Sequence, residues 1–254
     1  MILSDASTYR VRLAESPDDL RAAQRLRYQV FVDELGGDGA LVDHGAGLEC
    51  DALDPFADHL LLEEEPSGRI IGVYRLMLPE QAARAGGYYS SGEYDLAPLL
   101  RSGRRLLELG RSCLHPDARG GNGMHLLWSA LADYVAQHRI DVLFGVASFH
   151  GTDVESLAQP LSLLHHRHLA PADLRVRANP QGFHRMDLIP PERIDRKEAL
   201  LKVPSLIKAY LRLGGTVGEG AYVDTAFNTT DVCLIMDTAA LSARQARIYG
   251  GGRG

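Results

Sequence analysis

One segment constrains the fold more than any other. A short apolar run leads through a glycine-rich turn, "LLELGRSCLHPDARGGNG" (residues 106–123), into a stretch whose apolar residues recur at helical spacing. The run "IDVLFGVASF" (residues 140–149) follows and is almost continuously apolar. Apolar residues repeating every three or four positions predict a helix, and a short continuous run predicts a buried strand. We therefore expect strand, turn, helix and strand in that order, with the second strand suited to parallel pairing.

The glycine-rich turn also carries a chemical signal. Glycines before the first turn of a helix expose backbone N–H groups, which bind anions such as phosphate. Arg119 adds a positive side chain to "ARGGNG". A tight corner that binds nothing is the alternative, and the local residues leave both interpretations open.

The preceding residues predict a helix and a hairpin. In "ESPDDLRAAQRLRYQVFVDELGG" (residues 15–37), Ser16 is suited to the N-cap, and two glycines end the helix. Arg27 lies on the apolar face of that helix, and we expect it to extend to solvent or to pair with a surface acid. Two β-rich runs flank "PSGR" within residues 59–79, which predicts a hairpin with Arg75 in its second strand.

The remaining residues predict more helices and a return to strand. Residues 153–171 read as a helix interrupted at Pro160, and residues 196–215 as an amphipathic helix interrupted at Pro204. Residues 221–241 should contribute one or two strands. Because no Pro/Gly/Ser-rich linker separates two halves, we expect one domain over residues 1–254. Its core would span about 10–150 and 220–240, with a helical elaboration at about 155–220.

Composition narrows the class of protein. Hydrophobic content of 45% and charged content of 24% are typical of a soluble globular chain, and the formal charge of -6 argues against nucleic acid as a partner. No apolar run is long enough to span a membrane, and the first residues lack the features of a signal peptide. Three scattered cysteines without a CxxC pair suggest reduced thiols, so we expect a cytoplasmic location.

The strand, "HPDARGGNG", helix and apolar strand together resemble the acyl-CoA-binding half of the GCN5-related N-acetyltransferase superfamily. The resemblance implies an α/β (α+β) fold: a mixed, largely antiparallel sheet flanked by helices. In that superfamily the turn holds a pyrophosphate or a phosphopantetheine arm. Asn122 and Met124 stand where small residues are usual. This departure favours a donor on acyl carrier protein, whose arm has one phosphate, over coenzyme A.

Two further resemblances narrow the family. A set of aromatic and charged residues resembles those of the acyl-homoserine-lactone synthases: Arg27, Phe31, Asp51, Asp54, Arg75, Glu108 and Arg111. Those synthases carry a tryptophan soon after the Arg–Phe pair, whereas the one tryptophan here is Trp128. The phrases "LSLLHHRHLAPADLRVRA", "PSLIKAYLRLGGTVGEGAYVD", "FHGTD" and "FNTTDV" resemble the ornithine–acyl carrier protein N-acyltransferases, which make lyso-ornithine lipid. The resemblance covers residues 12–247, approximately.

The resemblance implies transfer of a 3-hydroxy fatty acyl group from acyl carrier protein to the α-amine of L-ornithine. The amine would attack the thioester directly, with no bound cofactor and with the phosphopantetheine arm as donor. The same chemistry on lysine, glutamine or glycine is one alternative. An enzyme similar to an autoinducer synthase is another, and a sensor that only binds acylated carrier protein is a third.

The resemblance also assigns roles to residues. Catalysis would involve Glu108 as first candidate for the base, with Arg111. His150 is a second acid–base candidate from its position just past the apolar strand and not from the resemblance. The acceptor would contact Arg27, Phe31, Asp51, Asp54 and Arg75. The donor would contact backbone near Ser112, Cys113 and Leu114, and the turn residues Arg119, Gly120, Gly121, Asn122 and Gly123. The alternative is that the charged residues form a buried ion network that only fixes the fold. Cys113 fits a small core residue better than a nucleophile.

Two other groups of residues invite interpretation. His165, His166 and His168 lack the spacing of a zinc site, so we expect no metal. Basic residues gather near one face within residues 196–215, namely Lys202, Lys208 and Arg212. They could dock acidic acyl carrier protein, contact anionic lipid on the inner face of the cytoplasmic membrane, or form a solvated surface.

Overall fold

The computed structural model describes residues 8–40 and 42–239 of the 254-residue chain. These residues form two compact units. The N-terminal unit contains residues up to Ala85 together with Leu109–Arg139, and the C-terminal unit contains Gly86–Glu108 and the residues from Ile140 onward. The chain crosses from the second unit back to the first inside strand β5, after Glu108. The expectation of one domain over residues 1–254, with its core and elaboration, stays a prediction.

The N-terminal unit is built on strands in the order β1-β2-β3-β5. β1 pairs antiparallel with β2, and β2 pairs antiparallel with β3 across the turn at "PSGR", which confirms the predicted hairpin. The strand bounds are Thr8–Leu13 (β1), Asp58–Glu65 (β2), Arg69–Met77 (β3) and Leu106–Leu114 (β5). Buried apolar side chains run along β2 and β3, as expected for central strands.

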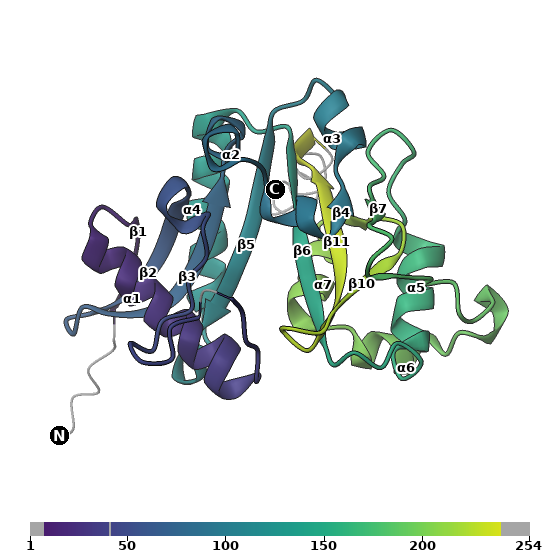
Figure 1. Cartoon of the computed structure of the whole chain (residues 1–254), viewed down its shortest axis with the longest axis horizontal. Helices are drawn as coiled ribbons and strands as arrows, with labels where there is room; N and C mark the ends of the chain where they lie inside the picture. The colour runs from purple at the N-terminus through teal and green to yellow at the C-terminus, as the bar shows by residue number, and fades with distance from the viewer. Residues whose placement is uncertain (1–7, 41, 240–254) are drawn as a thin grey trace, which may run out of the picture. The chain divides into compact units, whose positions relative to one another are not determined.

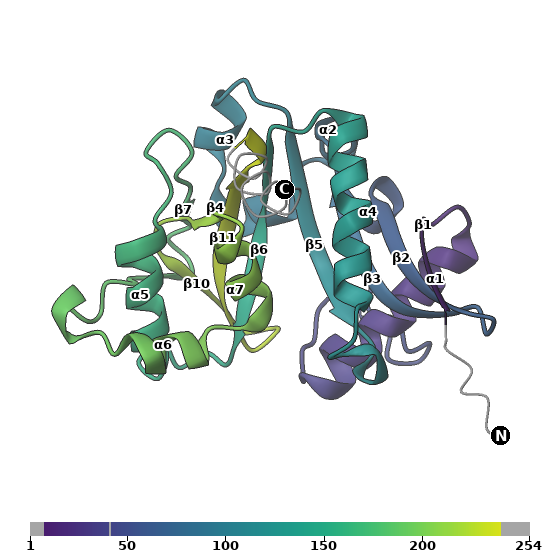
Figure 2. The ribbon, with the colours of Figure 1, turned by 180° about the vertical axis from the view of Figure 1, so that it is seen from behind.

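Two helices cover opposite faces of this sheet. Helix α1 (Pro17–Arg27) lies in front of β2 and β3 in Figure 1, and helix α4 (Gly123–His138) lies in front of them in Figure 2. The Ser16 side chain accepts a hydrogen bond from the Asp19 N–H at 3.1 Å, which confirms the predicted cap. The helix continues as a π-helix (η1, Tyr28–Glu34) until Gly36, where φ is 70°. The shorter helices of this unit are η2 (Asp54–Phe56), α2 (Pro79–Ala85) and η4 (Pro116–Ala118).

The C-terminal unit has strands in the order β5-β6-β11-β10-β8, with β9 also on β11. The first residues of β5, Leu106–Glu108, pair parallel with β6, which confirms the parallel pairing suggested by the apolar run. β6 pairs antiparallel along its whole length with β11. The strand bounds are Val142–His150 (β6), Phe183–His184 (β8), Thr216–Val217 (β9), Ala221–Asp224 (β10) and Thr229–Asp237 (β11). A separate pair joins β4 (Tyr94–Asp95) to β7 (Arg177–Ala178).

The helices of this unit correct one sequence prediction. α5 begins at Ala158, and the residues before it form turns, so the predicted helix interrupted at Pro160 is wrong. Pro160 lies in the first turn of α5, where its missing N–H removes no intrahelical hydrogen bond. The predicted break at Pro204 is confirmed, because α6 ends before it and α7 begins after it. The helix bounds are η3 (Tyr89–Gly92), α3 (Ala97–Arg101), α5 (Ala158–His168), η5 (Pro191–Arg193), α6 (Arg196–Lys202) and α7 (Ser205–Arg212).

Within the described part of the chain, no helix has the length and apolar character needed to cross a membrane.

Candidate functional site

The N-terminal unit contains a buried ion network that brings together five of the predicted residues. They come from α1, the loop before β2, β3 and β5. The network consists of Arg27, Asp51, Asp54, Arg75 and Arg111, with Glu49 as a sixth member that the sequence analysis did not single out. Three guanidinium groups therefore face three carboxylates, and their formal charges cancel.

Arg27 lies at the centre of this network with no exposed side-chain surface. Its Nη1 and Nη2 donate to the two carboxylate oxygens of Asp54, each at 2.8 Å. Its Nε donates to the Glu49 carboxylate, and its Nη2 to the Glu49 backbone oxygen. The expectation that Arg27 extends to solvent or pairs with a surface acid is wrong, because both partners are buried with it. A buried arginine is stable only when such paired carboxylates surround it.

Arg75 and Arg111 extend the network to its more exposed edge. Arg75 Nη1 donates to Asp51 at 2.6 Å and to Asp54 at 2.9 Å. Arg111 donates to Glu49 at 3.1 Å and to Asp51 at 3.2 Å. Asp51 and Arg111 keep 18% and 11% of their side-chain surface exposed, whereas Arg27 and Asp54 keep none. Of the predicted charged residues in this network, Asp51 and Arg111 are therefore the ones that a molecule arriving from solvent would meet first.

The arginines hold the two aspartates of the network in the charged form. Burial alone would raise the pKa of Asp54, but Arg27 and Arg75 hold that pKa well below its usual range. Burial likewise opposes ionisation of Asp51, and Arg75 and Arg111 lower its pKa overall. The same logic applies to Arg27, whose burial is more than offset by Glu49 and Asp54, so its pKa is raised.

Strand β5 is distorted at the predicted donor-contacting backbone. Arg111 has a φ of 50°, a left-handed conformation that costs a non-glycine residue about 1 kcal/mol. Local distortions of this kind re-aim side chains, and here the Arg111 side chain reaches Glu49 and Asp51. Two positions further along, Cys113 is buried with Leu61 and Val73. Burial raises the pKa of Cys113 to about 12, so its thiol stays protonated and belongs to the core.

The geometry of the turn after β5 explains why two of its residues are glycine. Gly120 has a φ of 79°, which glycine adopts without strain. Gly123 begins α4, and a Cβ there would lie 2.9 Å from a Leu62 methyl. Arg119 pairs with Glu34, with Nη–Oε distances of 2.6 and 2.7 Å. Anion binding by Arg119, Gly120, Gly121, Asn122 and Gly123 stays a prediction.

Glu108 belongs to the C-terminal unit and is nearly fully buried. Its Oε2 accepts the Tyr89 N–H at 2.9 Å, and its Oε1 accepts the Ser90 N–H at 2.7 Å. The carboxylate therefore anchors the start of η3, the short helix that leads to Glu93. A carboxylate oxygen has a second lone pair, so this anchoring is compatible with the predicted base role, which stays a prediction.

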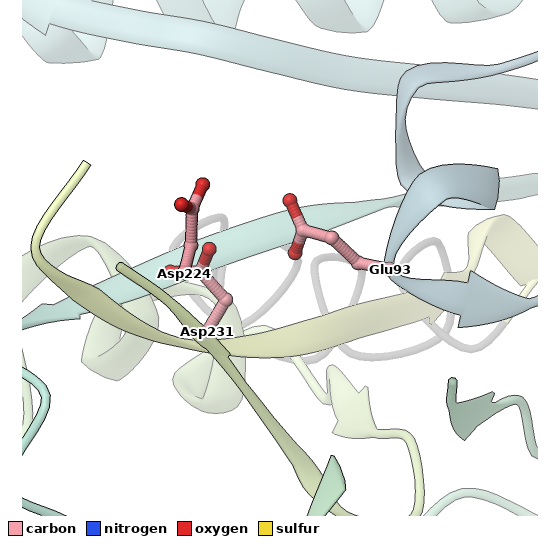
Figure 3. Close-up of side chains that lie close together, drawn as sticks. All are labelled: Glu93, Asp224 and Asp231. Carbon is pink, nitrogen blue, oxygen red and sulfur yellow. The ribbon is translucent and has the colours of Figure 1, made fainter. Parts of the chain in front are cut away.

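A second group of acids, Glu93, Asp224 and Asp231, lies in the C-terminal unit. We call this group the acidic cluster. One carboxylate oxygen from each residue lies within 4.8 Å of the others, and Figure 3 shows the three side chains converging. This cluster was not predicted from the sequence, because its members lie far apart along the chain: just after η3, in β10 and in β11. The one sequence signal was Asp231, which stands inside the otherwise apolar strand "TTDVCLIMD".

Comparisons with known proteins show the family to which the chain belongs. Residues 26–129 match the family model "Acetyltransferase (GNAT) domain". An "L-ornithine N(alpha)-acyltransferase" of Rhodobacter capsulatus is 58% identical over 95% of this chain and 95% of its own length. One of Brucella abortus is 43% identical over 98% of this chain and 92% of its own. The chain belongs to the L-ornithine N(alpha)-acyltransferase family.

Solved structures agree with this family at the level of fold. FeeM, an N-acyl amino acid synthase from uncultured soil microbes, matches with a TM-score of 0.56 at 13% identity over 94% of this chain and 95% of its own. LasI, an acyl-homoserine-lactone synthase, matches with a TM-score of 0.51 at 19% identity over 94% and 96%. These likenesses confirm the predicted fold: a mixed, largely antiparallel sheet flanked by helices.

The remaining predicted residues of this family member lie in separate places. Phe31 packs against the core of the N-terminal unit beside α1. His150 is exposed at the end of β6, opposite Thr229 of β11. Of the histidine run, His166 Nε2 bonds the Ile189 backbone oxygen, and the rings of His165 and His166 meet edge to face.

The predicted basic face is divided between two helices. Lys202 belongs to α6 and pairs with Glu198 at 2.9 Å, whereas Lys208 and Arg212 belong to α7. The apolar side of α7 is buried as predicted, through Ile207, Tyr210 and Leu211. The outer side of α6 also exposes apolar surface, since Leu200 is 37% and Leu201 is 72% exposed. Basic and apolar groups therefore occur together on the surface of these helices.

Proposed function

We propose that this protein transfers a 3-hydroxy fatty acyl group from acyl carrier protein to the α-amine of L-ornithine. The observation that carries the proposal is the full-length identity of 58% to an L-ornithine N(alpha)-acyltransferase. The amine nitrogen attacks the thioester carbonyl carbon, the carbon–sulfur bond breaks, and the carrier leaves as its free thiol. The proton lost by the amine returns to that thiolate. The product is lyso-ornithine lipid, with an amide in place of the thioester.

The choice of amine follows from its basicity. A side-chain amine of the lysine type has a pKa of about 10.4, whereas an α-amino group titrates at about 8. The α-amine therefore has the larger neutral fraction near pH 7, and its deprotonation by a base costs less free energy than that of the side-chain amine. Direct attack needs no enzyme nucleophile, which agrees with the buried, protonated thiol of Cys113.

The base in this proposal is Glu108, acting directly or through one water. Its two hydrogen bonds from the Tyr89 and Ser90 N–H groups fix the carboxylate in one orientation. Glu108→Gln keeps the shape and one acceptor oxygen, so it removes the base and retains one of the two anchoring hydrogen bonds. We expect a 10²- to 10⁴-fold fall in kcat, roughly, with the fold retained. A variant that turns over at a near-normal rate would exclude this role.

The donor in this proposal is the phosphopantetheine arm of acyl carrier protein. Backbone N–H groups near Ser112–Leu114 would stabilise the oxyanion, and the turn of residues 119–123 would hold the single phosphate of the arm. The helices α6 and α7 would dock the acidic carrier. Their exposed Leu201 and the cations Lys202 and Arg212 offer both of the contact types that such a protein surface needs.

The docking part is tested by charge reversal. Replacing Lys202, Lys208 and Arg212 with Glu should raise the KM for acylated carrier about tenfold or more, with little change in KM for ornithine. The matched control reverses the exposed residues Arg21, Arg84 and Arg101. If only binding to anionic vesicles falls, these helices contact lipid instead of carrier. An unchanged KM and unchanged vesicle binding would leave the helices with no docking role.

The reaction itself is tested by mass spectrometry. The pure protein is incubated with 3-hydroxyacyl carrier protein and an equal mixture of amino acids. An amide of ornithine acylated on the α-amine supports the proposal. An amide of lysine, glutamine or glycine would retain the chemistry and replace the acceptor. Intact acylated carrier in the presence of folded protein would contradict the proposal and favour a binding module.

A further inference from the structure

The acidic cluster is placed by the register of two strands. β10 and β11 pair so that Asp231 stands opposite Tyr222 and Asp224 stands opposite Thr229. Side chains two residues apart on a strand share a face, so Asp224 and Asp231 project from the same face of the sheet as diagonal neighbours. Glu93 approaches from η3, and Figure 3 shows its carboxylate directed toward the other two.

The segment that carries Glu93 is fixed by several hydrogen bonds. The hydroxyl of the next residue, Tyr94, donates to the backbone oxygens of Gly220 and Asp231, each at 3.0 Å. The Asn179 N–H donates to the Glu93 backbone oxygen at 2.7 Å. The Asn179 side-chain amide bonds the two preceding carbonyl groups. The three carboxylates are therefore held in place by the fold and do not belong to a mobile surface patch.

One carboxylate in the cluster is buried without a cationic partner among the described residues. Asp231 is only 4% exposed, and its Oδ1 accepts no hydrogen bond from the residues that the structure describes. Among those residues, neither Asp224 nor Asp231 forms an ion pair with a lysine, arginine or histidine. Burial, together with the charge of Asp224, raises the pKa of Asp231 to about 6, although side-chain hydrogen bonding with Ser148 and Thr229 works in the opposite direction. A cation brought by a ligand would stabilise the charged form of this buried carboxylate.

Solvent can reach the cluster from the neighbouring strand. Ser148 of β6 stands directly opposite Asp231 of β11, and Ser148 is exposed. His150, also exposed, stands opposite Thr229 on the same strand pair. The face that carries Asp231 therefore has exposed side chains beside the buried carboxylate.

We propose that the acidic cluster binds the side-chain ammonium of the acceptor amino acid. This inference rests on the proposed function, because it names the part of ornithine that the cluster recognises. An ammonium group has three N–H donors, which matches three carboxylates. With N···O distances of about 2.8 Å in a tetrahedral arrangement, the three acceptor oxygens would lie about 4.6 Å apart. The cluster, with its oxygens within 4.8 Å of one another, accommodates that spacing.

A divalent metal is the competing occupant of three carboxylates. Mg²⁺ binds oxygen at about 2.1 Å in an octahedron, which would bring neighbouring ligands to about 3 Å apart. The acids of the N-terminal network are poorer candidates for the ammonium. Both oxygens of Asp54 already accept hydrogen bonds from Arg27, and Asp51 pairs with Arg75 and Arg111. Contact of Asp51 and Asp54 with the acceptor stays a prediction, and the existing arginine pairs favour the acidic cluster as the site for the ammonium.

The experiment compares two acceptors that differ only in the ammonium. L-Norvaline has the carbon chain of ornithine without the terminal amine. The ratio of kcat/KM for L-ornithine to that for L-norvaline is measured with 3-hydroxyacyl carrier protein as donor. It is measured for the wild-type protein, Glu93→Gln, Asp231→Asn and the control Asp173→Asn, which neutralises an exposed acid of the same unit.

We expect the ratio to fall about 10- to 100-fold in Glu93→Gln and Asp231→Asn, mainly through KM for ornithine. Asp173→Asn should leave the ratio unchanged. A ratio within twofold of wild type in both cluster variants, with folding confirmed by circular dichroism, would overturn the proposal. So would wild-type turnover that is abolished by EDTA and restored by Mg²⁺, with this dependence lost in the cluster variants.

A binding measurement separates this inference from the proposed function. If the wild-type protein makes no ornithine amide, the proposed reaction fails. Calorimetric titration with L-ornithine and L-norvaline then tests separately whether the acidic cluster binds the side-chain ammonium. Binding of ornithine at least tenfold tighter than norvaline, lost in Glu93→Gln, supports the ammonium site. Equal binding of the two amino acids overturns it.

Discussion

The molecule holds two sets of three acids with opposite electrostatic surroundings. In the N-terminal network each acid is paired with arginine, and in the acidic cluster neither Asp224 nor Asp231 is paired with a cation among the described residues. Asp54 and Asp231 show the difference most clearly, because they are almost equally buried, at 1% and 4% exposed. The pKa of Asp54 lies well below its usual range, whereas that of Asp231 is raised to about 6. Burial alone thus does not determine the state of an acid; its partners do.

The two sets suit different tasks. A closed set of arginines and carboxylates has no remaining demand for a ligand, and it holds α1, the loop before β2, β3 and β5 together. Asp224 and Asp231, which have no cationic partner among the described residues, carry charge that a cationic ligand can satisfy. The comparison therefore assigns the N-terminal network mainly to the framework, with Asp51 and Arg111 at its exposed edge, and the acidic cluster to recognition.

The largest expected effect comes from opening the closed set. Arg27→Gln removes the central guanidinium and leaves Glu49 and Asp54 buried with fewer partners. We expect a loss of about 3–5 kcal/mol in the free energy of unfolding, measured by urea denaturation. Arg84→Gln, at an exposed position on α2, should change it by less than about 0.5 kcal/mol. A loss below about 1 kcal/mol for Arg27→Gln would break the comparison, because the network would then not stabilise the fold.

The next largest expected effect is a gain in stability. Asp231→Asn removes a buried charge that has no cationic partner among the described residues, so we expect the free energy of unfolding to rise by about 1–3 kcal/mol at pH 8. The folded pKa of Asp231 is raised to about 6, so the cost of its charge is absent below about pH 4, grows up to pH 6 and is complete above. The gain should therefore vanish in denaturation at pH 4. A variant less stable than wild type at pH 8 would show that the Asp231 charge is already compensated.

A smaller effect concerns the loss of folding stability at low pH. The folded pKa values of Asp51 and Asp54 are lowered, so the stability they contribute is present above their unfolded pKa of about 3.9 and is lost as pH falls below it. Between pH 5 and pH 3 the wild-type protein should lose stability more steeply than Arg27→Gln. Equal slopes in urea denaturation would mean that Arg27 does not hold these carboxylates ionised.

The sequence predicted the elements whose information is local. The strand, glycine turn, α4 and β6 follow from apolar spacing over neighbouring residues, and the cap at Ser16 follows from the residues beside it. Glu49, one of the two carboxylate partners of Arg27, could not be predicted in this way, because it comes from a loop without periodicity. The acidic cluster was missed because Asp224 and Asp231 meet only through strand register, and Glu93 approaches them from a distant segment. Pro160 was misread because a proline in the first turn and one inside a helix leave a similar local pattern.

The most direct test measures the two kinds of aspartate in one titration. Carbon-13 NMR of aspartate-labelled protein follows each carboxyl group with pH, with Asp54→Asn and Asp231→Asn used for assignment. We predict that Asp231 titrates at about pH 6 and shifts well below that when L-ornithine is added, while L-norvaline leaves it unchanged. Asp54 should remain ionised down to pH 3 with or without ligand. An Asp231 that titrates in the ordinary range, or that responds equally to both amino acids, would contradict the assignment of the acidic cluster to the ammonium.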